Sequence, residues 1–238
     1  MVNMAQKAQN RANNAVKESS EPSKGSSFPI VGVGASAGGL VAFTELLKHL
    51  PLDTGMGFVL VQHLDPQHDS ALTQLLARAT KLPVGEVMNN QPVEANRVYV
   101  IPPNTNLGIA QGVLKLRPCP QARTPHRSID FFFESLAEDQ RERAIGVILS
   151  GTATDGTLGL TAIKAEGGIT FAQDDSAQYD SMPRSAVAAG CVDFVLSPED
   201  IAKETRPHRP ASLCRRAADR IAYPGGRRAG DRDGARGR

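Results

Sequence analysis

The sequence predicts an α/β domain with a doubly wound, mostly parallel sheet, flanking helices and a small antiparallel β-hairpin insertion. Two observations predict it. Continuous apolar runs such as residues 57–61 (GFVLV) and 144–149 (AIGVIL) have the length and composition of strands buried on both faces. Segments with apolar residues at helical spacing alternate with these runs, and strand–helix alternation is typical of a doubly wound sheet. We place this domain at residues 28–202.

Strands are expected where apolar or alternating runs are bounded by turn residues. In chain order these runs are residues 28–33, 57–61, 83–87, 97–101, 144–149, 168–172 and 192–196. The two-residue turn Gln111-Gly112 separates residues 107–110 from 113–116, which predicts the hairpin.

Helices are expected in the segments between the strands. They are residues 39–50, 70–80, 128–141, 157–166, 183–189 and a last helix that opens at Pro198. Pro51 ends the first one, because proline cannot continue a helix. Ser197 is the expected N-cap of the last, with Pro198 at its first position.

Composition and charge limit the setting of the protein. Three scattered cysteines match neither a disulfide framework nor a zinc site, which favours a reducing, cytoplasmic compartment. No run approaches the roughly 20 apolar residues of a membrane span, so we expect no membrane insertion. Residues 1–27 are polar and predict a disordered leader, not a signal peptide.

The basic charge belongs to the end of the chain. Residues 203–238 hold 11 Lys and Arg against 4 Asp and Glu, a net charge of +7; the remaining 16 Lys and Arg and 21 Asp and Glu give −5. This segment predicts a basic, disordered tail, with a frameshifted or truncated end as the alternative. The main domain gives no reason to expect a specific nucleic-acid partner.

One serine lies in a glycine-rich turn between the first strand and the first helix. Ser36 is the centre of Gly34-Ala-Ser-Ala-Gly38, which matches the G-x-S-x-G turn of serine hydrolases. The N–H groups of the following helix favour negative charge there. The same stretch also resembles a dinucleotide loop, with Asp65 as the ribose-binding acid, but its glycine spacing departs from G-x-G-x-x-G.

Three expected strand ends carry reactive side chains: Ser36, His63 and Asp155. Ligands bind at the carboxyl ends of parallel strands, so neighbouring strands would bring these groups to one crevice. A serine nucleophile needs a base, and the base needs an orienting group; Ser–His–Asp supplies all three. In the structural alternatives, Ser36 is only a small turn residue, His63 is a structural histidine at a strand end, and Asp155 is a turn or N-cap residue.

A metal centre is the weaker alternative. His63, Asp65, His68 and Asp69 could supply ligands, but Pro66 lies between them and no helical face presents them together. We therefore expect neither a metal nor another cofactor.

The sequence resembles the catalytic domain of the CheB family of chemotaxis protein-glutamate methylesterases. The resemblance covers nearly all of the predicted domain. The motifs GTATDGT and FAQD look most like those of the methylesterase modules in CheB/methyltransferase hybrid proteins. The matching stretches are IVGVGASAGGL (30–40), VLVQHLDP (59–66), NRVYVIPPNTNL (96–107), HRSIDFFFESLAED (126–139), GVILSGTATDGTLGL (146–160), AEGGITFAQD (165–174) and MPRSAVAAGCVDFVLSPEDIA (182–202).

The resemblance implies a doubly wound fold and a triad of Ser36, His63 and Asp155. It implies hydrolysis of glutamyl γ-methyl esters on the cytoplasmic domains of chemoreceptors, with glutamine deamidation in some members. Methyltransferase and sensor-kinase components are further candidate partners. The family also carries an inhibitory receiver domain, and residues 1–27 are too short for one, so we expect no gating by phosphorylation of this chain.

Two stretches depart from the family pattern. The usual turn is G-A-S-T-G-G, and Ala37 replaces its threonine before Gly38. The usual aspartate loop is L-T-G-M-G-x-D-G, and Thr152 replaces a methionine associated with the oxyanion site. We expect Ala37, Gly38 and Thr152 to support the oxyanion site. The altered loops leave open a non-catalytic regulatory or interaction module, and nucleotide binding in the glycine turn is a third hypothesis.

Overall fold

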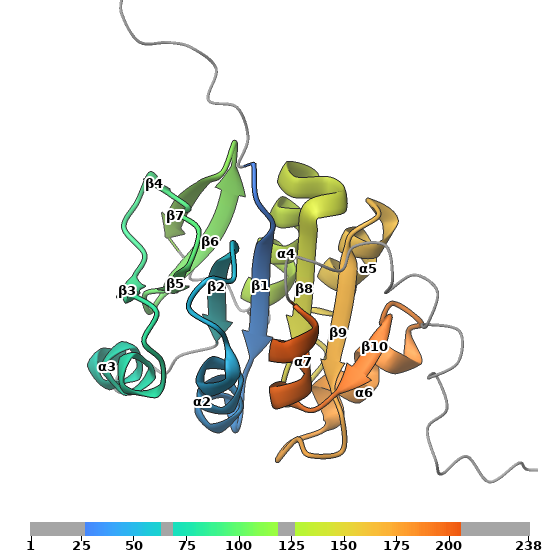
Figure 1. Ribbon diagram of the computed structural model, residues 1–238. Helices are drawn as coiled ribbons and strands as arrows, with labels where there is room; N and C mark the ends of the chain where they lie inside the picture. Colours follow the sequence, from blue (N-terminus) through green and yellow to red (C-terminus); the bar gives the residue numbers. More distant parts are fainter. Residues whose placement is uncertain (1–26, 63–68, 119–126, 206–238) are drawn as a thin grey trace, which may run out of the picture.

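A computed structural model describes residues 27–62, 69–118 and 127–205. Its main sheet has seven strands, all paired in parallel, in the order β10-β9-β8-β1-β2-β5-β3 (Figure 1). The predicted parallel sheet is therefore confirmed. The strands are β1 (Ile30–Ala35), β2 (Gly57–Gln62), β3 (Val84–Glu86), β5 (Arg97–Val100), β8 (Ala144–Ile148), β9 (Ile169–Gln173) and β10 (Phe194–Leu196).

Helices cover both faces of this sheet, as a doubly wound fold requires. On one face α2 (Gly39–His49), α3 (Asp69–Ala79) and α7 (Pro198–Glu204) contribute to one buried apolar cluster. On the other face α4 (Ser128–Gln140), α5 (Thr157–Ala165) and α6 (Ser181–Ala188) contribute to a second. Figure 1 shows α2 and α7 in front of the sheet and α4 behind it. Each helix in the described residues is too short or too polar to cross a lipid bilayer.

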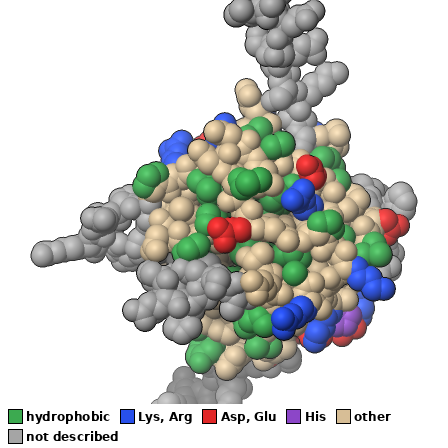
Figure 2. All heavy atoms as spheres, turned by 90° about the vertical axis from the view of Figure 1, so that its left-hand side faces the viewer, with side chains coloured by type: hydrophobic (Ala, Val, Ile, Leu, Met, Phe, Trp, Pro, Cys, Tyr) green, Lys and Arg blue, Asp and Glu red, His purple; other side chains and the backbone are tan. Residues whose placement is uncertain are grey.

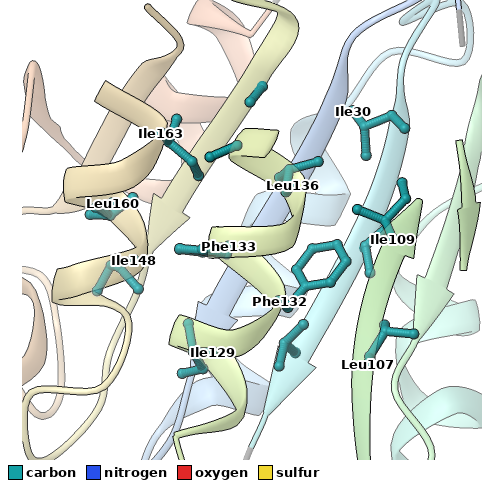
Figure 3. Close-up of a cluster of buried hydrophobic side chains, with 14 of the residues drawn as sticks. Ile30, Leu107, Ile109, Ile129, Phe132, Phe133, Leu136, Ile148, Leu160 and Ile163 are labelled. Atoms are coloured by element: carbon teal, nitrogen blue, oxygen red, sulfur yellow. The ribbon is translucent and has the colours of Figure 1, made fainter. Parts of the chain in front are cut away.

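The predicted hairpin is confirmed and belongs to a second sheet of three antiparallel strands. Its order is β4-β7-β6, with β4 at Gln91–Pro92, β6 at Thr105–Ala110 and β7 at Val113–Pro118. The sequence did not indicate β4, which is only a short bridge to β7. Leu107 and Ile109 of β6 face Phe132 of α4, so this sheet packs against α4 (Figure 3).

Element ends differ from the predictions by a few residues. The first strand runs from Ile30 to Ala35, later than predicted, because its pairing with β2 begins at Ile30 opposite Gly57. Helix α6 begins at Ser181 and includes Pro183 in its first turn. Proline is accepted there because the N–H groups of the first turn have no partner within the helix.

The strand β3 forms one edge of the main sheet and pairs only with β5 among the described strands. Figure 2 views the molecule from the side on which this edge lies in Figure 1. Hydrophobic side chains are dispersed there in small groups. The edge is short and carries an exposed Glu86, two features that discourage pairing with another chain.

Candidate active site

The candidate site lies at the carboxyl ends of β1 and β8. The strands on one side of β1 (β2, β5, β3) come before those on its other side (β8, β9, β10) in the chain. The strand order therefore reverses between β1 and β8, and such a switch point is where open α/β sheets bind their ligands. The condition for Ser36, His63 and Asp155 to share one crevice was that the strands before them are neighbours, and β1 does lie between β2 and β8.

Ser36 is the first residue after β1 and opens a tight turn. The Ser36 carbonyl accepts a hydrogen bond from the Gly39 N–H (2.9 Å), and Gly38 has φ 74° and ψ 2°. These are the dihedral angles of the third residue of a type II turn, which favours glycine. A Cβ on Gly38 would also lie 2.6 Å from Ser150 Oγ. Helix α2 starts at Gly39, so Ser36 stands at its positive end.

The turn at Ser36 is bonded directly to the loop after β8. The Leu149 N–H donates to the Gly34 carbonyl (2.9 Å), and the Ser36 N–H donates to the Ser150 carbonyl (3.0 Å). A Cβ built on Gly151 would lie 3.2 Å from the Ser36 Cβ. The two loops at the switch point are thus in contact, and Ser36 lies at the point of contact.

Asp155 lies in the same loop, in the turn before α5, and is buried with 6% of its surface exposed. Its Oδ2 accepts from the Ile129 N–H (3.0 Å) and its Oδ1 from the Asp130 N–H (2.9 Å). These are N–H groups at the start of α4, which stabilise a negative charge. Asp155 thus caps α4, whereas the N-cap of the helix that follows it, α5, is Gly156 with no side-chain cap bond. A carboxylate has further lone pairs, so capping and orienting a histidine are compatible.

The Ser150 hydroxyl connects the segment that contains Tyr179 to the turn at Ser36. Its hydroxyl donates to the Ala37 carbonyl (2.8 Å) and accepts from the Tyr179 N–H (3.0 Å). Its own N–H donates to Gln173 Oε1 (2.9 Å). Sequence reasoning missed Ser150, because only the folded chain brings it to a carbonyl 113 residues away in sequence.

His63 lies outside the described residues, as do Asp65 and His68; Asp69 opens α3, and its side chain is likewise outside them. The strand that leads to His63 ends at Gln62, which is paired with Ala35 at the end of β1. Gln62 Nε2 donates to the Ser36 carbonyl at 3.3 Å. Thus β2 ends beside the serine turn, while the triad base and the metal alternative remain predictions.

Comparison with known proteins decides the family. The family profile described as CheB methylesterase matches residues 31–205.

The chain belongs to the CheB methylesterase family.

A protein-glutamate methylesterase/protein-glutamine glutaminase of Burkholderia orbicola is 40% identical over 179 residues, which are 74% of this chain and 52% of that protein. The chain therefore spans about half the length of the Burkholderia relatives it matches. A Leptospira interrogans protein, named provisionally for the same two activities, is 35% identical over 74% of this chain and 92% of its own length. The crystal structure of the Thermotoga maritima CheB methylesterase catalytic domain matches with a TM-score of 0.71 and 29% identity, over 76% of this chain and 98% of that one.

This CheB-family chain has a polar network below the aspartate loop that sequence reasoning missed. Asp130, in the first turn of α4, is buried and accepts from the Gly159 N–H of α5 (2.7 Å). Its other oxygen accepts from Arg127 Nε (3.1 Å) and Nη2 (2.7 Å). Burial raises the pKa of Asp130 and the nearby charge of Asp155 adds to this, while Gly159 and Arg127 act in the opposite direction. The only sequence signal for this network was that Asp130 is an acidic residue in the first turn of a predicted helix.

The departures from the family pattern in the aspartate loop lie on the surface. Thr152, Ala153 and Thr154 are exposed, in contrast to the buried Asp155 that follows. Ala153 has φ 71°, a left-handed conformation that disfavours residues with a Cβ by about 1–2 kcal/mol. Ala153 occupies the place of the second glycine in L-T-G-M-G-x-D-G. The backbone of this chain therefore has a conformation typical of glycine at a position where the residue is alanine.

A pocket of about 220 Å³ opens beside the serine turn, between Gly38 and Ser150 on one side and Glu45 and Glu199 on the other. The residues Glu45, His49 and Glu199 bring three potential metal ligands within 4.8 Å of one another. Each carboxylate already has a lysine partner: Glu45 lies 3.4 Å from Lys48 and Glu199 lies 2.7 Å from Lys203. Ion pairing at the surface therefore accounts for this cluster.

Proposed function

We propose that this chain is a serine esterase that hydrolyses glutamyl γ-methyl esters on chemoreceptors to glutamate and methanol. In this proposal Ser36 is the nucleophile, His63 the base, and Asp155 the group that orients His63. The observation that carries it is the contact at the switch point between the Ser36 turn and the loop of Asp155, whose carboxylate is buried and held by two N–H groups. Membership of the CheB family supports the same reaction.

The reaction has two halves. Ser36 Oγ attacks the ester carbonyl carbon while His63 takes the hydroxyl proton. The tetrahedral intermediate then breaks its bond to the methoxy oxygen, which receives that proton from His63 and leaves as methanol. Water, deprotonated by His63, attacks the glutamyl ester of Ser36 and releases glutamate and the free serine.

The negative oxygen of the intermediate needs hydrogen-bond donors. The backbone N–H groups of Ala37 and Gly38, at the positive end of α2, are the proposed donors, with the Thr152 loop as the opposite wall. A backbone donor is independent of its side chain, so Ala37 can replace the usual threonine of this turn.

Receptor glutamines offer the same carbonyl with ammonia as the leaving group. The relatives from Burkholderia and Leptospira are named for both activities, so we include deamidation as a second reaction of the same site. The proposed setting is cytoplasmic, with the cytoplasmic domains of methylated chemoreceptors as partners and with methyltransferase or sensor-kinase components as further partners.

A non-catalytic regulatory or interaction module is the second candidate. The observation that favours it is the aspartate loop, where Thr152 and the left-handed Ala153 depart from the family pattern.

Methanol release from methylated chemoreceptor membranes tests the two candidates. We expect the wild type to release methanol and the Ser36→Ala variant to do so at least a hundredfold more slowly. If neither protein releases methanol while both show the same folded circular dichroism spectrum, the esterase proposal is wrong and the interaction module takes its place.

A further inference from the structure

The two peptide groups that follow Ser36 are both held by their carbonyl oxygens. The Ser36 carbonyl accepts from the Gly39 N–H (2.9 Å) and from Gln62 Nε2 (3.3 Å). The Ala37 carbonyl accepts from Ser150 Oγ (2.8 Å). Every peptide bond of the described residues is trans, and in a planar trans peptide the N–H points opposite to the C=O. The Ala37 N–H therefore points away from Gly39 and Gln62, and the Gly38 N–H points away from Ser150.

The peptide between Ala37 and Gly38 is the one whose orientation the backbone alone leaves open. It is the central peptide of the turn, and rotating it by about half a turn converts a type II turn into type I. Gly38 does not prevent this rotation, because glycine adopts both positive and negative φ. The hydrogen bond from Ser150 to the Ala37 carbonyl therefore selects the orientation of the Gly38 N–H.

The Ser150 hydroxyl is itself fixed in place. The Tyr179 N–H donates to it at 3.0 Å, and the Ser150 N–H donates to Gln173 Oε1 at 2.9 Å. Only 1% of the Ser150 surface is exposed, so the hydroxyl is held among protein groups. The network extends from β9 through Ser150 to the serine turn.

We propose that Ser150 is a positioning residue for catalysis, which holds the Gly38 N–H as an oxyanion donor. Gln62 acts on the neighbouring peptide, where it holds the Ala37 N–H. Neither side chain touches the substrate in this scheme; each acts through a backbone carbonyl. The inference rests on the proposed esterase function, because donors stabilise a transition state only if they are oriented before the reaction begins.

A matched pair of variants tests the role of Ser150. Ser135 on α4 makes hydrogen bonds of the same two kinds. Its hydroxyl donates to the Phe132 carbonyl (2.8 Å) and accepts from the Ile109 N–H (3.1 Å). We expect kcat for methanol release to fall at least tenfold in Ser150→Ala, with KM within twofold of the wild type. Ser135→Ala should keep kcat within twofold, and Ser150→Thr, which retains the hydroxyl, should recover most of the rate.

A second measurement separates the chemistry from receptor binding. A fluorophosphonate forms a bond from its phosphorus to Ser36 Oγ, loses fluoride and leaves the serine proton on the base. Its phosphoryl oxygen needs the same donors as the ester intermediate. The labelling rate should therefore fall in Ser150→Ala and stay unchanged in Ser135→Ala.

The outcomes are distinguishable. If Ser150→Ala and Ser135→Ala retain equal kcat and labelling rates beside an active wild type, the inference is overturned and the esterase function stands. If the wild type neither releases methanol nor reacts with the probe, the proposed function is overturned and the inference with it. If Ser150→Ala does not fold, Ser150→Thr is compared with Ser150→Val, because threonine and valine have the same shape and only threonine has the hydroxyl. Equal activities of these two variants would also overturn the inference.

Discussion

Asp130 and Asp155 each bind the start of the other's helix. Asp155, just before α5, accepts from the Ile129 and Asp130 N–H groups of α4, and Asp130, in α4, accepts from the Gly159 N–H of α5. The two carboxylates therefore fasten α4 to α5 below the candidate site. The position of the proposed triad aspartate depends on this exchange.

The two aspartates should separate stability from catalysis. In Asp155→Asn and in Asp130→Asn, an amide NH₂ takes the place of a carboxylate oxygen that accepts hydrogen bonds from N–H groups. A donor then faces donors, so we expect each variant to lose about 1–3 kcal/mol of unfolding free energy, measured in urea. Methanol release should fall at least a hundredfold more in Asp155→Asn than in Asp130→Asn, because only Asp155 is proposed to orient His63. Equal losses of activity would show that Asp155 serves the fold alone.

The raised pKa of Asp130 predicts a pH dependence of stability. Burial places the folded-state pKa above the ordinary value of 3.8, so the folded protein holds this proton when the unfolded chain has lost it. The contribution of Asp130 to stability is thus fully present below that ordinary value and is lost as the pH rises through the raised pKa. The unfolding free energy of the wild type minus that of Asp130→Asn should therefore fall over this window.

Arg127 provides the control for this pH effect. Its guanidinium donates two hydrogen bonds to Asp130 and lowers the pKa of that carboxyl. In an Arg127→Gln background the fall should therefore extend to higher pH. A difference in unfolding free energy that stays constant with pH would contradict the assignment.

Ala153 offers a stabilising substitution. At φ 71° a glycine avoids the Cβ clash, worth about 1–2 kcal/mol, while it loses about 0.5–1 kcal/mol through the greater freedom of the unfolded chain. We expect Ala153→Gly to raise the unfolding free energy by about 0.5–1 kcal/mol. Ala189, exposed at φ −73°, is the matched control, and Ala189→Gly should be destabilising. If both variants shift stability in the same direction, Ala153 is not strained.

Asp139 links α4 to the turn of the β6–β7 hairpin. Its carboxylate accepts from the Gln111 N–H and from the Gly112 N–H (3.0 Å). Asp139→Asn should cost about 1 kcal/mol of stability and should speed hydrogen exchange at these two amides, with methanol release unchanged. Unchanged exchange rates would show that the turn holds without the carboxylate.

Local pattern was enough to predict most of the fold. The buried strands β1, β2 and β8 are short apolar runs, and the Gln111-Gly112 turn indicated its hairpin, because these signals lie within a few residues. The ends of elements were less accurate, as with Pro183 inside α6, since pairing and first-turn geometry set them.

Local sequence patterns were sufficient for the fold class, the CheB resemblance and the choice of Ser36 and Asp155, because strand periodicity and glycine turns are local properties. The packing of the folded chain was needed to show that Asp155 caps α4, that Asp130 accepts a hydrogen bond from α5 in return, and that Ser150 reaches the Ala37 carbonyl. Those partners are separated by 25, 29 and 113 residues. Their meeting depends on how β8 packs beside β1 and how α4 and α5 pack on the sheet, which no short stretch of sequence encodes.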